Sequence, residues 1–142
     1  MATSSSVALP GAMDSLYTLI SFVTSYAGEQ GIAGEKISAI ELALEEVLVN
    51  IIKHTYEESG LQDLIEINCG TDAGSLVIEI IDSGKPFDIF SVREPDIYAD
   101  IDERQIGGLG IFFVKKLMDD VRYRREDGRN ILTLVAKNTP SQ

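Results

Sequence analysis

The chain has 142 residues, of which 44% are hydrophobic and 25% are charged. This length and composition predict one globular domain with a sizeable core and exclude disorder for the bulk of the chain. Lys and Arg total 12 and Asp and Glu total 23, which gives a formal net charge of −11. Such an acidic chain argues against nucleic acid and an anionic membrane as partners. No apolar run approaches the roughly 18 residues of a membrane span.

The residue counts also restrict the chemistry. Cys69 is the only cysteine and His54 the only histidine, which excludes an internal disulfide, a cysteine-rich zinc site and a histidine-rich metal centre. A Ser–His–Asp or Cys–His arrangement would have to use His54. The N-terminus lacks the basic segment and apolar core of a signal peptide, so we expect a cytoplasmic protein.

The first part of the chain predicts a short strand and two helices. Residues 1–6 read as a loose tail and residues 7–9 as a short edge strand. Apolar residues recur at helical spacing over 13–27, where Gly28 can end a first helix. A second, longer helix is expected over 36–54.

The pattern then changes to alternation, which predicts two hairpins. Their strands cover residues 64–69 and 76–81, then 121–125 and 131–136, with a helix over 111–118 between the two pairs. Thr71 to Gly74 and Asp127-Gly128 supply the turns. Hairpins with helices gathered elsewhere predict a single α/β two-layer sandwich over 7–138, with a mostly antiparallel, mixed sheet of about four to five strands packed on three helices. Residues 139–142 read as a tail.

From Asp82 to Gly110 no regular pattern persists. So long an irregular stretch is unusual in a compact domain unless the loop has a function. Glycines flank it on both sides, which indicates a lid over about 91–107 that is hinged at its two ends. The alternative is an ordinary loop with a short helix near 96–100.

The second predicted helix carries a polar strip on an otherwise apolar segment. Glu46, Asn50 and His54 follow one another at intervals of four and therefore stack in line. Ala39 and Ala43 share the strip and leave room in front of it. This pattern suits a pocket wall, although a solvated polar seam remains the alternative.

Two glycine-bearing segments flank the irregular stretch. Asp82 ends a strand before Ser83-Gly84, where a carboxylate suits a ligand donor such as an exocyclic amine; an ordinary turn is the alternative. Gly107-Gly108-Leu109-Gly110 directly precedes a helix, whose N-terminus is a candidate anion site. Neither a P-loop nor a Rossmann pattern accompanies these glycines.

Together these segments resemble one family. Residues 46–54 resemble the N-box of the Bergerat-fold ATPases, the superfamily of histidine kinases and gyrase. Asp82-Ser83-Gly84 resembles the first glycine box of that superfamily and residues 107–110 its second. Thr133 sits where the family has a Thr or Ser near the adenine. The resemblance covers roughly residues 9–137.

Within the superfamily, the chain is most similar to the bacterial anti-sigma-factor serine/threonine kinases. Residues 82–88 resemble their variant of the first box, and residues 108–119 their second box with its helix. Two departures are Ile51, where Ala often follows the N-box Asn, and Pro86, which fits this branch but not the histidine kinases. The lid itself has no clear likeness.

The resemblance implies ATP and Mg²⁺ as cofactors, in a Bergerat fold with an ATP lid. It implies that Glu46 acts as general base and that Asn50 supplies an oxygen to Mg²⁺. The implied nucleotide-binding residues are Asn50, Lys53, Asp82, Gly84, Gly108, Leu109, Gly110 and Thr133. Glu45 is a weaker candidate for the base, since it faces another way on the helix. Lys53 also reads as a solvated residue, His54 as a structural residue and Cys69 as part of the core.

The function implied is an enzyme: a protein serine/threonine kinase that sequesters a sigma factor and phosphorylates an anti-anti-sigma partner of the STAS type. The first alternative is a nucleotide-gated binding module with little kinase activity, in which ATP orders the lid. A catalytic fragment of a two-component histidine kinase is the second, against which the short N-terminal segment argues. The resemblance also allows a homodimer, and no nucleic acid or membrane is expected as a partner.

Overall fold

Five strands form one sheet in the order β1-β2-β3-β5-β4, and each neighbouring pair is antiparallel. The computed structural model describes residues 4–86 and 108–138, except for the side chains of 108–112. The strands are β1 (Ser4–Pro10), β2 (Leu64–Asp72), β3 (Ser75–Asp82), β4 (Asp120–Glu126) and β5 (Arg129–Lys137). The described strands therefore contain no parallel pair, so among them the sheet is antiparallel rather than mixed.

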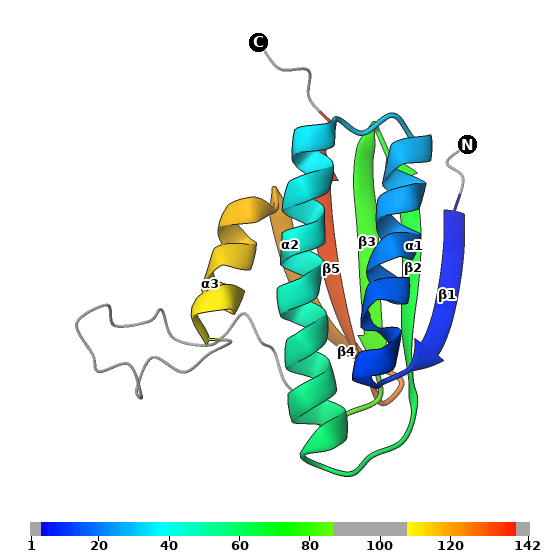
Figure 1. Ribbon diagram of the computed structural model, residues 1–142, viewed down its shortest axis with the longest axis vertical. Coiled ribbons are helices and arrows are strands. Elements are labelled where there is room, and N and C mark those ends of the chain that lie inside the picture. The colour runs from blue at the N-terminus through cyan, green and yellow to red at the C-terminus, as the bar shows by residue number, and fades with distance from the viewer. Residues whose placement is uncertain (1–3, 87–107, 139–142) are drawn as a thin grey trace, which may run out of the picture.

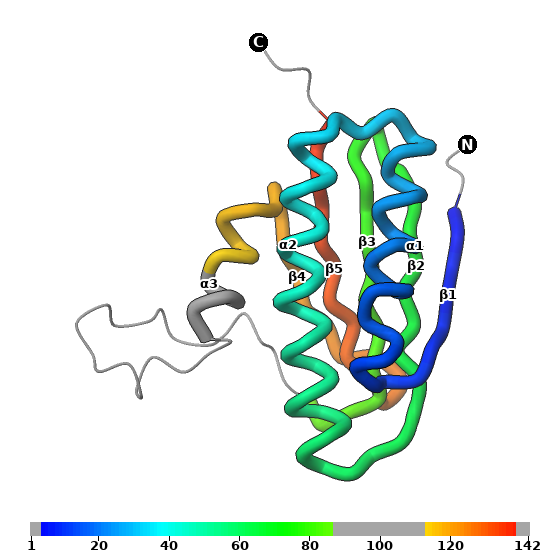
Figure 2. The backbone as a smooth tube through the Cα atoms, viewed as in Figure 1, coloured from blue at the N-terminus to red at the C-terminus, as the bar shows by residue number. Residues whose placement is uncertain are grey.

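The helices form a second layer on one face of this sheet (Figure 1). They are η1 (Met13–Ser15), α1 (Leu16–Glu29), α2 (Gly34–Ile51), η2 (Ile52–Glu57) and α3 (Gly108–Leu117). Helix α2 packs against α1 on one side and against α3 on the other, and the smooth tube of Figure 2 shows α1 and α2 running along the strands. The predicted two-layer α/β sandwich is confirmed. We call the sheet face under α1 and α2 the covered face and the other the opposite face.

The hydrophobic core lies between the two layers, because alternate residues of a strand point to the same face. Ile78 and Ile80 of β3 face Leu134 and Leu132 of β5, and all four are buried in the core. The other members include Ile65, Ile67 and Cys69 of β2 and Ile40, Ala43, Leu44, Val47, Leu48 and Ile51 of α2. The parity of these strand residues defines the covered face for the polar residues discussed below.

Both predicted hairpins are confirmed, and each closes through a two-residue turn. Ala73 and Gly74 have φ angles of 51° and 86°, and Asp127 and Gly128 have φ angles of 53° and 75°. Positive φ at both central positions is the geometry that matches the twist of paired strands, and it favours glycine at the second position. Local sequence therefore decides these two turns.

The N-terminal elements differ from the prediction at both ends. Strand β1 begins at Ser4 rather than Val7, because β2 supplies backbone partners to Ser4, Ser5 and Ser6; the expected tail over 1–6 is wrong for these three residues. Helix α1 continues past Gly28 to Glu29. It ends where Gly31 adopts a φ of 79° and the N–H of Ile32 binds the carbonyl of Ala27, which is a Schellman closure.

The second predicted helix is two elements. The α-helical part ends at Ile51, and residues Ile52–Glu57 continue as a π-helix with wider i→i+5 hydrogen bonding. None of the helices among the described residues combines the length and apolarity needed to span a membrane. The predicted lid over 91–107 and the tail over 139–142 lie outside the described residues.

Candidate functional site

The end of β3 and the C-terminal end of the α2–η2 helix meet closely at one point. A Cβ atom added to Gly84, just beyond β3, would overlap the Cγ2 methyl of Thr55 in η2. Gly84 is itself buried, and it does not have a left-handed φ. Glycine is therefore required here by the approach of the helix rather than by backbone conformation. This contact brings the first glycine box beside the N-box-like helix.

Glu46 and Asn50 lie in the regular part of α2, one helical turn apart, so their side chains share one side of the helix. Both are half-buried, whereas Ala43, Val47 and Ile51 of the same helix are buried in the core. Glu45 is also half-buried. Burial therefore does not choose between the two glutamates, and only the spacing to Asn50 favours Glu46.

The third residue of the expected polar strip, His54, lies beyond α2. It falls in the π-helix η2, whereas Glu46 and Asn50 lie in α2. Its Nδ1 lies 3.0 Å from Oε1 of Glu58 and its side chain is exposed. His54 thus lies at the end of the helix, in agreement with its interpretation as a structural residue. Lys53 is exposed in the same element.

Asp82 is a buried carboxylate, with only 4% of its surface exposed. Its Oδ1 accepts the backbone N–H of Gly84 at 2.9 Å and the Nδ2–H of Asn130 at 3.0 Å. The first contact closes an Asx turn, so the ordinary-turn interpretation is correct for this oxygen. Among the described residues, Oδ2 has no such partner and remains an acceptor for a ligand donor.

Asn130 is a site residue that the sequence analysis missed. It lies on β5 directly opposite Asp82 and is 3% exposed. A signal for it existed: Asn130 has the same strand parity as the core residues Leu132, Leu134 and Ala136, and a buried amide at such a position needs partners. That Asn130 lies opposite Asp82, in contrast, gives no local sequence signal, because it depends on the pairing of β3 with β5.

Thr133 does not lie where the resemblance places it, and this is a correction. Thr133 pairs with Glu79 of β3, and Asn130 pairs with Asp82. Because successive strand residues point to opposite faces, Asp82 and Asn130 share the covered face while Thr133 lies on the opposite face. Thr133 is 7% exposed, so burial alone would not reveal the error. Its hydroxyl is on the wrong side of the sheet to join Asp82.

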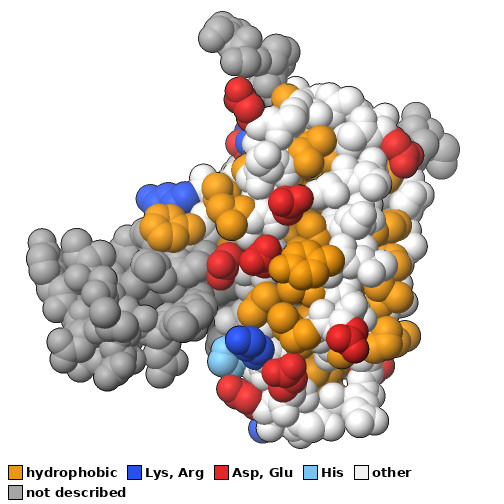
Figure 3. All heavy atoms as spheres, in the orientation of Figure 1, with side chains coloured by type: hydrophobic (Ala, Val, Ile, Leu, Met, Phe, Trp, Pro, Cys, Tyr) orange, Lys and Arg blue, Asp and Glu red, His pale blue; other side chains and the backbone are white. Residues whose placement is uncertain are grey.

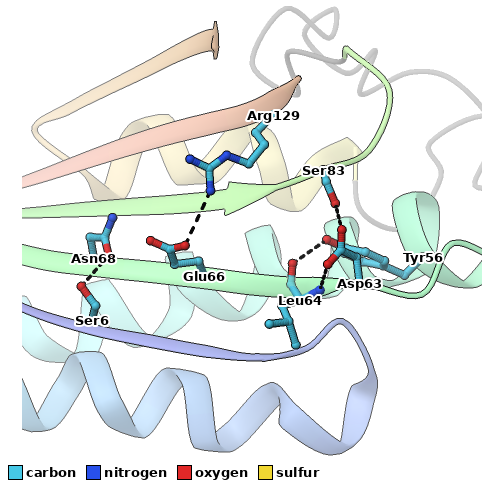
Figure 4. A network of polar contacts seen from close by, with 8 residues as sticks. All are labelled: Ser6, Tyr56, Asp63, Leu64, Glu66, Asn68, Ser83 and Arg129. Atoms are coloured by element: carbon cyan, nitrogen blue, oxygen red, sulfur yellow. Dashed lines mark hydrogen bonds and ion pairs between the residues drawn. The ribbon is translucent and has the colours of Figure 1, made fainter. Parts of the chain in front are cut away.

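A second polar network holds the Asp82–Gly84 turn from the side of β2 (Figure 4). Ser83 donates its hydroxyl to Oδ2 of Asp63 at 2.6 Å, and Leu64 donates its N–H to Oδ1 of Asp63 at 2.7 Å. The hydrogen bond from Ser83 and then that from Leu64 hold the pKa of Asp63 below its ordinary value. Tyr56 donates to the carbonyl of Leu64 at 2.9 Å, and burial raises its pKa.

The second glycine segment forms the first turn of α3. The helix starts at Gly108, so Gly108, Leu109 and Gly110 are helical rather than a loop before the helix. The first backbone N–H groups of a helix lack partners within it, so this turn keeps the donors that an anion would need. Gly107 lies outside the described residues.

The residues present suit a magnesium-bound nucleotide better than a metal held by protein alone. In residues 4–86 and 108–138, no three His, Cys, Asp or Glu side chains come together as a metal-binding group. The amide of Asn50 and the carboxylate of Glu46 are hard oxygen donors, the type that Mg²⁺ prefers, and Mg²⁺ commonly takes its other ligands from phosphates and water. Acidic side chains are scattered over the helix-bearing face (Figure 3), and a counter-cation would reduce their repulsion of a polyanionic ligand.

Cys69 is excluded as a nucleophile. Its side chain is 2% exposed in the core, and burial raises the pKa of its thiol to about 12. The reactive thiolate form is therefore negligible near neutral pH. The prediction that Cys69 is a core residue is confirmed.

Comparison with known proteins identifies the family of this chain. The family model of the histidine kinase-like ATPase domain matches residues 9–136. The chain belongs to this family. The match spans α2, the Asp82 turn and α3, which are the elements that surround the candidate site. The predicted Bergerat-type ATPase family is confirmed, and an ATPase domain of this family implies the use of ATP.

The similar proteins agree with the family. The serine-protein kinase RsbW of Listeria monocytogenes is 28% identical over 116 residues, which cover 78% of this chain and 72% of that protein. The RsbW of Bacillus cereus is 29% identical over 110 residues, which cover 75% and 68%. The predicted likeness to the anti-sigma-factor kinases is confirmed by these relatives.

A solved structure confirms the fold of the domain. A crystal structure of the RsbU and RsbW domains from Mycobacterium tuberculosis matches 95% of this chain with a TM-score of 0.67 and 16% identity. This chain spans 32% of that longer chain. At this level of identity the likeness supports the arrangement of sheet and helices.

Proposed function

We propose that this chain is an ATP-dependent protein serine/threonine kinase of the anti-sigma-factor type, which sequesters a sigma factor and phosphorylates an anti-anti-sigma protein of the STAS type. The observation that carries the proposal is the pair Glu46 and Asn50, half-buried one turn apart on α2, in a chain with relatives that are named serine-protein kinases. A protein that only bound nucleotide would not need the carboxylate.

The proposed division of labour follows from the residue types. Asn50 offers its side-chain oxygen to Mg²⁺, and the ion supplies charge neutralisation at the phosphates. Asp82 accepts a hydrogen bond from the adenine amino group through Oδ2. Gly84 allows the close approach to Thr55, and the N–H groups of Gly108, Leu109 and Gly110 face the phosphates. Lys53 adds positive charge near them.

Glu46 is proposed as the general base. It takes the proton of a serine hydroxyl on the partner, the hydroxyl oxygen attacks the terminal phosphorus of ATP, and the bond to the bridging oxygen breaks with release of ADP. Phosphoryl transfer depends mainly on positioning and charge neutralisation. Loss of Glu46 should therefore slow transfer while leaving nucleotide binding close to wild type.

The test compares two adjacent glutamates. Purified protein, radiolabelled ATP, Mg²⁺ and a STAS-type protein from the same cell are incubated, and the label on serine is counted over time. We expect Glu46→Gln to reduce transfer by about 10²- to 10⁴-fold and the matched control Glu45→Gln to retain it. Equal activity of wild type and Glu46→Gln would remove Glu46 from the mechanism. ATP binding with no transfer by the wild type would favour the nucleotide-gated binding module.

A second experiment tests the metal and nucleotide site itself. Calorimetric titration with ATP should show Mg²⁺-dependent binding by wild type and its loss in Asn50→Ala, while circular dichroism shows an unchanged fold because Asn50 is not in the core. Wild-type affinity in Asn50→Ala would contradict the assignment of Asn50.

A further inference from the structure

The side-chain amide of Asn130 is at the centre of a buried polar network. Its Nδ2 donates to Oδ1 of Asp82 at 3.0 Å and to the carbonyl of Lys85 at 2.8 Å. Its Oδ1 accepts from the hydroxyl of Tyr123 at 2.7 Å and from Nη1 of Arg125 at 3.2 Å. This amide therefore links β4 and β5 to the Asp82–Lys85 turn, and Arg125 of β4 also contacts the turn directly, by donating Nη1 to the carbonyl of Gly84 at 2.7 Å.

These partners fix the orientation of the amide. The nitrogen faces two acceptors, on Asp82 and Lys85, and the oxygen faces two donors, on Tyr123 and Arg125. Rotation of the amide by half a turn would set its oxygen against a carboxylate and a carbonyl, and its nitrogen against two donors. Only one orientation satisfies this network, and each mismatched buried group would be costly.

The fixed amide has a consequence for Asp82. With Gly84 and Asn130 both on Oδ1, the carboxylate is held by one oxygen. The other oxygen, Oδ2, has no described hydrogen-bond partner and is the edge left for a ligand. Because Asp82 itself is buried, a ligand group that cannot donate to Oδ2 would leave a desolvated acceptor unpaired.

We propose that Asn130 is a positioning residue that determines the base specificity of the site. By holding Oδ1, it directs Oδ2 of Asp82 toward an exocyclic amino group, so that 6-aminopurine nucleotides bind in preference to purines that lack this group. The inference rests on the proposed function, in which Asp82 contacts the base. Tyr123 supports the arrangement from β4 by fixing the oxygen of the Asn130 amide.

The experiment separates this role from a general structural one. Wild type, Asn130→Ser and Tyr123→Phe are titrated calorimetrically in Mg²⁺ with ATP and with purine riboside triphosphate, which has hydrogen in place of the amino group. The measured quantity is the ratio of the two dissociation constants. In wild type we expect purine riboside triphosphate to bind about 10- to 100-fold more weakly, the value of a hydrogen bond to a charged group.

In Asn130→Ser the ratio should fall to within about threefold of one, while the affinity for purine riboside triphosphate changes by less than about threefold, because the phosphate contacts remain. Tyr123→Phe keeps Asn130 and should reduce the ratio by a smaller factor, so it tests the proposal even if Asn130→Ser does not fold. A ratio that stays at the wild-type value in both variants, whether or not the absolute affinities fall, would overturn the role of Asn130. A wild type that binds neither nucleotide would instead overturn the proposed function.

Discussion

Asn130 and Thr133 are two polar residues of β5, three positions apart, that lie on different faces of the sheet. Asn130 and Thr133 are both buried, at 3% and 7% exposure, and both lie on the strand next to β3. Asn130 is on the covered face, where it holds Asp82. Thr133 is on the opposite face beside Glu79, which forms an ion pair with Arg124 at 3.2 Å. The face of the sheet, rather than burial or chemical type, thus determines which residue can reach the ligand.

The two faces also differ in how their polar groups are used. On the opposite face, ion pairs cross between strands near the surface, such as Arg129 with Glu66 at 3.6 Å (Figure 4), and such exposed pairs contribute little to stability. On the covered face, the Asp82–Asn130 pair is removed from water, and a buried donor or acceptor left without a partner there would destabilise the protein or its complex. Substitutions on the covered face should therefore alter ligand binding, and those on the opposite face should not.

Asp82→Asn tests the covered face most strongly. The amide can keep the contacts of Oδ1 but turns the Oδ2 edge into a donor, which then meets the amino group of adenine. We expect ATP affinity to fall by about 10- to 100-fold, with a much smaller change for GTP. Calorimetric titration with both nucleotides measures this. Equal losses for the two would indicate a damaged fold rather than a lost base contact.

Gly84→Ala tests whether the helix fixes the turn that carries Asp82. The added methyl overlaps the Cγ2 of Thr55, so we expect the free energy of unfolding to fall by about 1–3 kcal/mol. Thr55→Ser removes that methyl, and the double variant should recover most of the loss, as urea denaturation of all four proteins would show. If Gly84→Ala is as stable as wild type, the helix does not press on the turn as described.

Ser83→Ala removes the outer contact of the same turn, where we expect a smaller and pH-dependent effect. The hydrogen bond from Ser83, together with that from Leu64, lowers the pKa of Asp63. The stability that this ionised carboxylate contributes is therefore present above the pKa of Asp63 in the unfolded chain, and it is lost as the pH falls through the lower pKa of the folded protein. The melting temperature of Ser83→Ala should be below that of wild type at pH 7, and the gap should close below roughly pH 4. A constant gap from pH 7 to pH 3 would exclude the Asp63 carboxylate as its cause.

Thr133→Val should have the smallest effect on ligand binding. Valine matches the shape of threonine without the hydroxyl, and this side chain lies on the opposite face from Asp82. We expect the dissociation constant for ATP with Mg²⁺ to stay within about twofold of wild type. Asn130→Ser, measured in the same way, is its counterpart on the covered face. A loss of ATP affinity in Thr133→Val that matched the loss in Asn130→Ser would remove the distinction between the two faces.

The sequence was informative where structure depends on neighbouring residues. Alternation, the turn residues Thr71 to Gly74 and the pair Asp127-Gly128 predicted both hairpins, because tight turns need only local backbone geometry. The spacing of Glu46 and Asn50 predicted their common side of a helix. Cys69 was predicted to be buried from its alternation with Ile65 and Ile67, and it is.

Prediction failed where the answer depends on segments distant in sequence. The placement of Thr133 required the register of β5 against β3, which one sequence does not reveal and which a one-residue slip would invert. Ser4 to Ser6 have no apolar pattern and join the sheet only because β2 supplies partners. The π-helix after Ile51 gives no recognisable local signal, so the expected helix over 36–54 was not divided at that residue.

We expect the nucleotide to bind on the covered face, at the Asp82–Asn130 pair. Nuclear magnetic resonance can test this location by following the side-chain amide of Asn130 and the methyl of Thr133 while ATP and Mg²⁺ are added. We predict a large, saturable shift of the Asn130 amide signals and a much smaller change at the Thr133 methyl. A saturable shift at Thr133 with an unchanged Asn130 amide would show that the nucleotide does not bind at this pair.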